Sequence, residues 1–227
     1  MRDTVLFDIN ETVLSLAPLK PKFATYFGSA DYTDTWFSML LHSSTVAIAT
    51  RVKSDFATLA KIALQTLASK KQILLSEAQQ TEILSTFANL PAHTDIKPAL
   101  IWLRDNGYRT VALSNSSSKL ITTQIENAGL TEYFDQVISV EETESFKPCT
   151  DVYHYAASKV ERSVEDLRLV ATHDWDTHGA MMAGMRAAYI NRSGALYHPL
   201  YKKAEVVADN MQQLVEQIVN IDNKLKA

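Results

Sequence analysis

The chain has 227 residues, 46% of them hydrophobic, which is enough for one large domain or for a domain with an insertion. Its net charge of −4 comes from interspersed acidic and basic residues without a basic stripe, so we expect no nucleic-acid partner. The single Cys149 excludes an internal disulfide, and no apolar run suits a leader or a bilayer span, so we expect a cytoplasmic protein without membrane contact.

The first predicted element is a strand. Val5 to Phe7 form a short apolar run of strand type, which ends abruptly at Asp8 and a polar loop. In an open α/β sheet, ligands bind beyond the carboxyl ends of the strands, and Asp8 would stand at such an end. The alternative is that Asp8 only caps the following turn.

A long helical stretch follows the first strand and shows almost no strand alternation. Between Ser54 and Ser69, apolar residues recur at helical spacing and form one face. Ser76 to Gln79 has the form of a capping box that starts another helix. Thr33 to Ile48 carries more apolar surface than a single core-facing stripe requires. These segments are typical of a helical bundle.

From residue 95 onward, helical and strand patterns alternate. The expected strands lie at residues 108–113, 136–140, 167–171, 187–191 and 206–208. Repeated βα units of this kind build a parallel sheet with helices on both faces. The sequence therefore predicts an α/β protein: a Rossmann-like, doubly wound core from residues 1–14 and 93–227, with a helical cap inserted at residues 15–92.

Polar side chains follow several of the predicted strands. They are Asp8, the pair Ser114-Asn115, Lys147, and the run from His173 to Asp176. Because parallel strands present their carboxyl ends at one edge of a sheet, we expect these side chains to gather there. A carboxylate, a cation, a hydroxyl and amide pair, and a histidine flanked by acids indicate a hydrolytic site rather than a binding surface.

Four short motifs in this order resemble the haloacid dehalogenase superfamily. They are Phe-Asp-x-x-x-Thr with Asp8 and Thr12, Leu-Ser-Asn ending at Asn115, Lys-Pro with Lys147, and Trp-Asp ending at Asp176. The match covers nearly the whole chain and is closest to the L-2-haloacid dehalogenase branch. The resemblance implies a small halogenated carboxylic acid as substrate, no cofactor and no metal. The branch, together with the apolar excess in the cap, also favours a homodimer.

The resemblance also implies the main site roles. Asp8 would displace halide from C2 of a 2-haloacid in one inverting step, and water would then hydrolyse the aspartyl ester to a 2-hydroxy acid. Lys147 would hold Asp8 ionised and stabilise negative charge; otherwise it is a surface lysine before a turn. Asp176 would bond Lys147 or orient the water, its alternative being an acidic residue favoured in the first turn of a helix.

Further positions take supporting roles in the same resemblance. Thr12 would tie down the loop after Asp8, Ser114 would hydrogen-bond the carboxylates, and Asn115 would contact substrate or the leaving halide. Helix capping is the alternative for the last two. Tyr153 sits where that branch places an active-site tyrosine, with ordinary helix packing as the alternative.

Position 10 separates the two main chemistries of the superfamily. Its phosphatases carry a second aspartate two residues after the nucleophile, which protonates the leaving group. This chain has Asn10, which cannot donate and recover a proton in that way. Halide needs no protonation, so Asn10 favours dehalogenation over phosphoryl transfer.

The chain departs from the best-known dehalogenase pattern at the halide site. That pattern has an arginine directly after a tryptophan of the first cap helix, whereas this chain has Phe37 after Trp36. A halide would then rest against Phe37, Leu41 or Trp175, helped by the Asn115 amide, because the edges of aromatic rings carry partial positive charge. The alternative is that Trp36 and Phe37 only form the seam between cap and core.

A second departure is His173, where better-known members carry an asparagine. A neutral histidine is a suitable base for activating water at pH 7, and Glu11 could orient its imidazole. The pair resembles a sub-branch with a His/Glu dyad, whose motifs Asn-Glu-Thr and His-x-Trp-Asp both occur here. The alternatives are a solvated loop acid for Glu11 and a helix-cap residue for His173.

The sequence thus predicts a hydrolase that dehalogenates short 2-haloalkanoic acids. Three other functions stay open. One is a Mg²⁺-dependent phosphatase that uses Asp174 and Asp176 as metal ligands, and another is a hydrolase of some other small acid. The third is a non-catalytic binding protein, for which a set of Asp8, Lys147 and Asp176 would be hard to explain.

Overall fold

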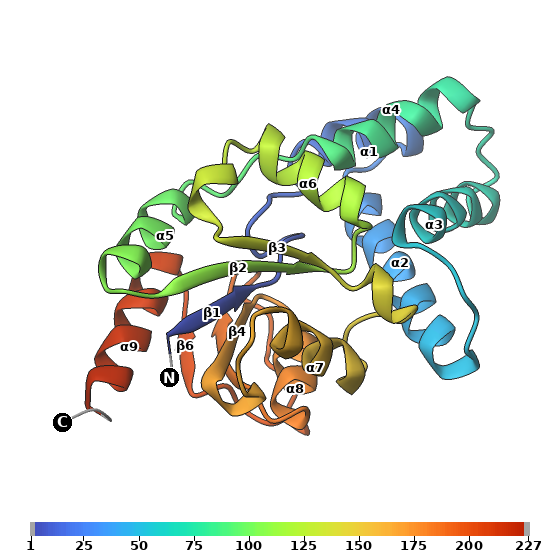
Figure 1. The fold of residues 1–227 in the computed structure, drawn as a ribbon. Coiled ribbons are helices and arrows are strands. Elements are labelled where there is room, and N and C mark those ends of the chain that lie inside the picture. Colours follow the sequence, from blue (N-terminus) through green and yellow to red (C-terminus); the bar gives the residue numbers. More distant parts are fainter. Residues whose placement is uncertain (1–2, 225–227) are drawn as a thin grey trace.

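The computed structural model describes residues 3–224 and contains a six-stranded parallel sheet (Figure 1). The strand order is β3-β2-β1-β4-β5-β6, and every neighbouring pair is parallel. This confirms the prediction of a doubly wound, Rossmann-like sheet. The strands are β1 (Thr4–Phe7), β2 (Arg109–Ser114), β3 (Gln136–Ser139), β4 (Leu167–Ala171), β5 (Arg186–Ile190) and β6 (Val206–Ala208).

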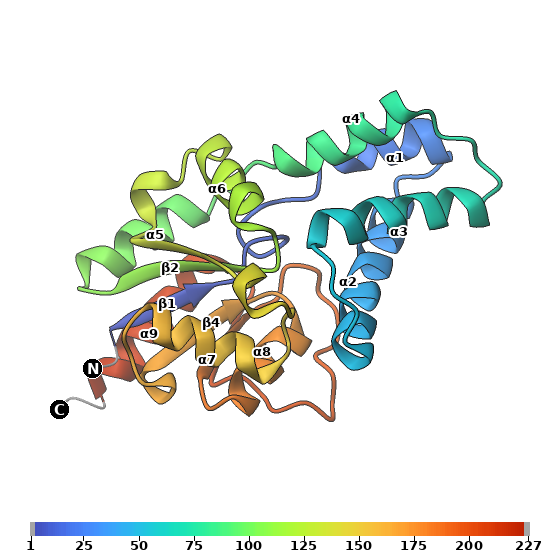
Figure 2. The ribbon, with the colours of Figure 1, turned by 45° about the vertical axis from the view of Figure 1, so that its right-hand side comes forward.

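Helices cover both faces of the sheet (Figures 1 and 2). One face carries α5 (Ile96–Asp105), α6 (Ser118–Asn127) and α9 (Met211–Lys224), and the other carries α7 (Thr150–Lys159) and α8 (Asp174–Met182). Every residue of β1 and β4 is buried, as expected for central strands covered on both faces. Short 3₁₀ helices lie at Thr131–Tyr133, Glu141–Thr143 and Val164–Asp166. Within residues 3–224, no helix is both long and apolar enough to cross a membrane.

The register of β1 determines where the first candidate residue lies. Phe7, the last residue of this strand, pairs with Ala112 on β2 and with Val170 on β4. The backbone N–H of Asp8 still donates to the Val170 carbonyl at 2.9 Å. Asp8 therefore stands one residue beyond the strand, at the carboxyl edge where neighbouring parallel strands also end.

Four helices between residues 15 and 92 form a group beside the sheet (Figure 2). The chain enters and leaves this group at one place, where the Ser15 N–H donates to the Pro91 carbonyl and the His93 N–H donates to the Val13 carbonyl, both at 2.9 Å. The helices are α1 (Leu19–Phe27), α2 (Tyr32–Thr50), α3 (Phe56–Lys70) and α4 (Glu77–Ala88).

Local sequence explains how the helices of this group begin and pack. The N-terminus of α4 has the reciprocal capping box that the sequence predicts, between Ser76 and Gln79. In α3, the Asp55 side chain accepts the Thr58 N–H. Trp36 of α2 is fully buried, and its indole N–H donates to the Ala60 carbonyl of α3 at 3.0 Å. Trp36 is thus part of the interior of this helical group rather than of a ligand site.

A buried ionic cluster fixes α9 against the sheet at the edge opposite Asp8. The Asp222 carboxylate accepts two bonds from Arg168 at 2.8 and 3.0 Å, one from Arg186 at 2.6 Å and one from the Tyr108 hydroxyl at 3.0 Å. The side chains of Asp222 and Arg168 are both 0% exposed. Burial and the Asp222 charge raise the pKa of Tyr108 to about 12, so this hydroxyl remains a donor.

Removing the carboxylate should leave two buried guanidinium groups short of counter-charge. We expect Asp222→Ala to lower the free energy of unfolding by about 3–5 kcal/mol, measured by urea titration. The matched control is Asn223→Ala at the exposed neighbouring position of the same helix, which should change it by less than about 0.5 kcal/mol. Equal effects of the two substitutions would show that the cluster does not stabilise the fold.

Candidate active site

Asp8 lies at the start of the loop after β1, and its carboxylate is held between Thr12 of the same loop and Lys147. Asp8 is buried; its Oδ1 accepts from Lys147 Nζ at 2.6 Å and its Oδ2 accepts from Thr12 Oγ1 at 2.7 Å. The same Thr12 oxygen accepts the backbone N–H of Thr172 at 2.9 Å. Thr12 therefore ties the loop after β1 to the loop after β4, and its side chain fixes the orientation of the Asp8 carboxylate.

Lys147 lies at the centre of the charged residues and is 1% exposed. Its ammonium donates to Asp8 and to Asp176 Oδ2, both at 2.6 Å, and to the Leu113 carbonyl at 3.2 Å. The Tyr153 hydroxyl donates to Asp176 Oδ1 at 2.6 Å. All three protons of the Lys147 ammonium thus have acceptors. The Asp176 carboxylate is bonded by Lys147 at one oxygen and by Tyr153 at the other.

These contacts set the protonation of the nucleophile candidate. Burial acts to raise the pKa of Asp8, but the Lys147 charge and the bonds from His173 and Lys147 outweigh it and hold this pKa well below its usual range. Burial acts to lower the pKa of Lys147, and the charges of Asp176 and Asp8 raise it on balance. Burial is the main reason that the pKa of Asp176 is raised. Asp8 is therefore ionised at neutral pH while shielded from water.

His173 contacts the Asp8 oxygen that Lys147 does not bond. Its Nδ1 lies 3.1 Å from Asp8 Oδ2, and its Nε2 lies 2.8 Å from Glu11 Oε2. Its ring stacks with Phe37, with centroids 6.2 Å apart, and with Trp175, at 5.1 Å. The structure thus brings the two residues of the predicted dyad together with the carboxylate on which they would act.

The contacts of His173 favour its protonated form in the free protein. Burial acts to lower its pKa, but the bonds and charges of Asp8 and Glu11 outweigh burial and raise this pKa to about 10. The sequence predicts the pairing with Glu11, but it does not show that Asp8 contacts the second ring nitrogen. His173 is consequently an imidazolium at pH 7 while Asp8 carries its charge.

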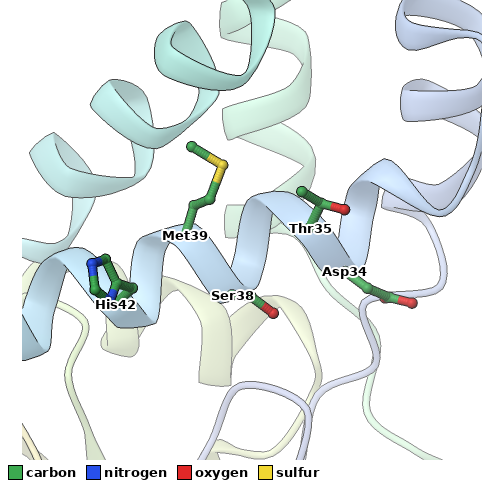
Figure 3. Close-up of a pocket in the computed structure, with 5 residues that line it drawn as sticks. All are labelled: Asp34, Thr35, Ser38, Met39 and His42. Atoms are coloured by element: carbon green, nitrogen blue, oxygen red, sulfur yellow. The ribbon is translucent and has the colours of Figure 1, made fainter. Parts of the chain in front are cut away.

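A cavity of about 270 Å³ opens beside these residues, and its lining includes Phe37, Leu41, His173 and Trp175. The predicted substrate-contact side chains from α2 and from α8 therefore line the same cavity. A larger hollow of about 520 Å³ lies along α2, lined by Asp34, Thr35, Ser38, Met39 and His42 (Figure 3). All of its lining comes from this one helix and includes none of the predicted site residues.

Ser114 does not bond the carboxylates as the resemblance implies, and Asn115 has a protein partner besides the substrate contact expected for it. The Ser114 hydroxyl accepts the backbone N–H of Ser116 at 3.1 Å, and no bond joins it to a carboxylate among the described residues. The Asn115 side-chain oxygen accepts the backbone N–H of Lys147 at 2.8 Å. Ser114 thus shapes the turn after β2, because its oxygen is taken up locally. Asn115 holds the lysine in place, and its amide NH₂ stays available for a ligand.

The residues of the phosphatase alternative do not fit a magnesium site. Asp176 accepts bonds from Lys147 and Tyr153, and Asp174 Oδ2 accepts the backbone N–H of His198 at 3.0 Å. Asn10 lies where an acid/base would act, but its amide donates to Ser116 and its oxygen accepts from Gln124. The candidate ligands are therefore engaged with the protein, and position 10 anchors α6.

Two positioning residues were not predicted from the sequence. The His93 ring bonds the Glu11 carbonyl at 3.0 Å, and Arg192 donates to the Thr12 carbonyl at 3.1 Å while it pairs with Asp95. Glu11 adopts a left-handed backbone conformation with φ of 64°, which a non-glycine residue adopts only when its surroundings hold it. The contacts from His93, just before α5, and from Arg192, just after β5, hold the loop in that conformation.

Gly179 of α8 is a further requirement of the site. A Cβ atom at this position would lie 2.5 Å from Pro148 Cβ and 2.8 Å from the Tyr153 hydroxyl. We expect Gly179→Ala to displace Tyr153 from Asp176 and to lower the free energy of unfolding by about 1–3 kcal/mol, measured by urea titration. Met182→Ala, at a position of the same helix that is 56% exposed, is the control. If Gly179→Ala left the free energy of unfolding unchanged, the packing of Pro148 and Tyr153 against Gly179 would not exclude a side chain at this position.

The comparisons with known proteins agree with this geometry. A family model described as haloacid dehalogenase-like hydrolase matches residues 2–168. The chain is similar to (S)-2-haloacid dehalogenase 2 of Pseudomonas sp. (strain CBS-3), at 26% identity over 62% of this chain and 61% of that protein. It is also similar to haloacetate dehalogenase H-2 of Moraxella sp. (strain B), at 27% identity over 63% of each. The chain thus matches somewhat less than two thirds of the length of these relatives.

Solved structures extend the likeness over the whole fold. The L-2-haloacid dehalogenase from Xanthobacter autotrophicus superposes with a TM-score of 0.87 at 21% identity, covering 96% of this chain and 98% of that one. A HAD phosphatase from Thermococcus onnurineus reaches a TM-score of 0.63 at 23% identity, covering 95% of this chain and 97% of that one. Because the family model covers most of the sequence, the chain belongs to the haloacid dehalogenase-like hydrolases.

Proposed function

We propose that this protein hydrolyses short 2-haloalkanoic acids to 2-hydroxy acids. The observation that carries the proposal is the Asp8 carboxylate, ionised and buried between Lys147 and His173 at the carboxyl edge of the sheet. Such a carboxylate is a nucleophile toward carbon. The nearby dyad suits the hydrolysis of the ester that this attack would form.

In the first step, an Asp8 oxygen attacks C2 of the substrate as the halide departs with the bonding electrons. Lys147 bonds the other Asp8 oxygen and orients the carboxylate. Burial of Asp8 strengthens the attack because the oxygen carries little hydration to lose. The product of this step is an ester between the Asp8 side chain and C2, with inversion at that carbon.

In the second step, water attacks the carbonyl carbon of the ester. His173 accepts one proton of that water, and Glu11 holds the other side of the imidazole at 2.8 Å. Collapse of the tetrahedral intermediate breaks the bond between the carbonyl carbon and the alkoxide oxygen. The second proton of the water goes to that alkoxide, which leaves as the 2-hydroxy acid and restores Asp8.

The cavity beside the dyad favours a small substrate. Its volume of about 270 Å³ and its lining by Phe37, Leu41 and Trp175 suit a short alkyl chain and a halogen that rests against ring edges. The Asn115 amide supplies a donor for the substrate or the departing halide. Because the chain lacks the arginine of the best-known dehalogenases, binding of the substrate and the halide would then depend on these contacts.

The activities for which the similar proteins are named support this proposal. They include several (S)-2-haloacid dehalogenases and a haloacetate dehalogenase. The similar Xanthobacter autotrophicus enzyme is also known with chloropropionic acid covalently bound. We propose that this chain likewise forms a covalent ester with a short chlorinated acid.

Three further features belong to the same proposal. Helices α1 to α4 would act as a cap that excludes water during displacement, in keeping with Phe37 and Leu41 reaching the cavity from α2. The protein would act as a homodimer, and it would do so in the cytoplasm. Gel filtration with light scattering tests the dimer, for which a mass near twice 25.4 kDa is expected.

Release of halide tests the proposed function. We expect the purified protein to release chloride or bromide from 2-chloropropionate, 2-bromopropionate or haloacetate, one for each 2-hydroxy acid formed, without added metal. Phosphate monoesters with and without Mg²⁺ are assayed in parallel. Release of phosphate that depends on Mg²⁺, with no halide from any of the haloacids, would replace this proposal by the phosphatase alternative.

A further inference from the structure

Both ring nitrogens of His173 face carboxylate oxygens. Nδ1 lies 3.1 Å from Asp8 and Nε2 lies 2.8 Å from Glu11. An ionised carboxylate only accepts hydrogen bonds, whereas a neutral imidazole has one donor nitrogen and one acceptor nitrogen. Both contacts are hydrogen bonds only if both nitrogens carry a proton. The geometry of the free protein therefore requires an imidazolium, which has no lone pair with which to activate water.

The remaining charged groups around His173 do not bond its ring. They approach from α1, α2, α8, the loop after β5 and the segment before α5, and several have partners of their own. Only Asp8 and Glu11 lie within hydrogen-bond distance of the imidazole among the described residues. The groups that do not bond it are Lys20, Asp34, Asp174, Arg192, His93 and, behind Asp8, Lys147.

Resting on the proposed function, we propose that the charge of Asp8 controls the base: His173 is a proton-bearing cation in the free enzyme and becomes a base only after Asp8 is esterified. Esterification removes the negative charge that faces Nδ1, while Glu11 keeps its charge and its bond to Nε2. The proton that becomes more acidic is consequently the one on Nδ1. Once it leaves, the bare nitrogen faces the ester that must be hydrolysed.

The proton balance of the cycle follows from this order. Displacement joins an Asp8 oxygen to C2 and expels halide, with His173 still protonated. The Nδ1 proton then passes to solvent water through the hollow of about 490 Å³ that His173 and Glu11 line, where the Glu11 side chain is 34% exposed. Hydrolysis returns one proton from water to Nδ1 and gives the other to the alkoxide. The single proton released in each turnover thus leaves before hydrolysis.

Glu11 is a positioning residue in this scheme, because it selects which nitrogen becomes basic. A carboxylate at Nε2 stabilises the tautomer with the proton on that nitrogen. The left-handed backbone of Glu11, bonded at its carbonyl by His93, aims the side chain at the ring. The raised pKa of His173, about 10 in the free protein, agrees with two ionised partners.

The first experiment is a titration of the ¹⁵N-labelled imidazole by NMR, with the signal assigned through His173→Gln. In the unmodified protein, His173 should stay protonated until close to pH 10. Asp8→Asn imitates the loss of charge on esterification, and His173 should then titrate about two pH units lower, with its remaining proton on Nε2. Glu11→Gln should also lower the titration point, so the test does not depend on a single variant.

Asp34→Asn is the control, because it neutralises a carboxylate that lines the same cavity without a bond to the ring. It should leave the titration of His173 close to that of the unmodified protein. A titration near pH 6.5 in the unmodified protein would overturn the proposal. So would an Asp8→Asn variant, shown to be folded and intact by mass, in which His173 titrates as before.

The second experiment follows one turnover with 2-chloropropionate at pH 8.5 in weak buffer with an indicator dye. One proton per site should appear together with chloride and before the 2-hydroxy acid. Protons that appear only with the hydroxy acid would contradict the proposed order. Absence of chloride would instead defeat the proposed function, and the titration, which needs no substrate, would still decide whether Asp8 controls His173.

Discussion

Asp8→Asn should reduce steady-state halide release by about 10⁴-fold or more, because an amide replaces the oxygen nucleophile on which both steps depend. The substitution is nearly isosteric, and Lys147 retains Asp176 as a counter-ion, so the fold should persist. The measurement is chloride release with 2-chloropropionate under saturating conditions. Circular dichroism and the NMR titration described above verify the folded state.

The matched control for this variant is Asp151→Asn, which removes a carboxylate from the exposed first turn of α7. It should leave halide release within a factor of about two, since a surface substitution away from the site has little effect. An Asp8→Asn protein that stays intact by mass and still releases halide at a rate comparable to the control would exclude Asp8 as nucleophile.

His173→Asn should separate the two halves of the reaction. Displacement needs no base, so each site should release one halide rapidly; hydrolysis should then slow by about 10²–10⁴-fold. The measurement is rapid-quench chloride analysis combined with intact-protein mass spectrometry. A burst of one chloride per site and a mass increase equal to the carboxyethyl group esterified to Asp8 are the expected results.

His154→Asn, at an exposed position of α7, serves as the control and should turn over without accumulating the adduct. If the His173 variant instead lost the chloride burst as well, the imidazole would be needed for displacement. If it turned over at the full rate, another group would have to activate the water. Either outcome would remove His173 from the role assigned to it.

The sequence predicts most elements of the fold because their patterns are local. The strand at Leu167–Ala171 and the capping box at Ser76 occur as predicted. The prediction did not single out α1, since Pro18 and Pro21 interrupt its start; a proline is tolerated in a first turn, where its missing N–H would lack a helical partner. The strand order depends on packing between distant segments, which no local pattern contains.

At the site, the motifs predict which residues gather but not the charges that they carry together. Asp8, Lys147 and Asp176 meet as the resemblance implies, with bonds of 2.6 Å. The protonation of His173 depends on two carboxylates that lie 3.1 and 2.8 Å from its ring nitrogens, and the motifs do not contain these distances. The sequence did not single out Gly179, because the lack of room for a Cβ atom there comes from Pro148 and Tyr153, which lie far from it in the sequence.

The central claim is that a covalent ester forms on Asp8 and that water cleaves it at the carbonyl carbon of that side chain. Single-turnover hydrolysis of 2-chloropropionate in ¹⁸O-water, with mass spectrometry of the peptide containing Asp8, tests this most directly. We expect one ¹⁸O atom in the Asp8 carboxylate and unlabelled oxygen in the 2-hydroxy acid. Label in the hydroxy acid with none in the peptide would mean that water attacks C2 directly, and would contradict it.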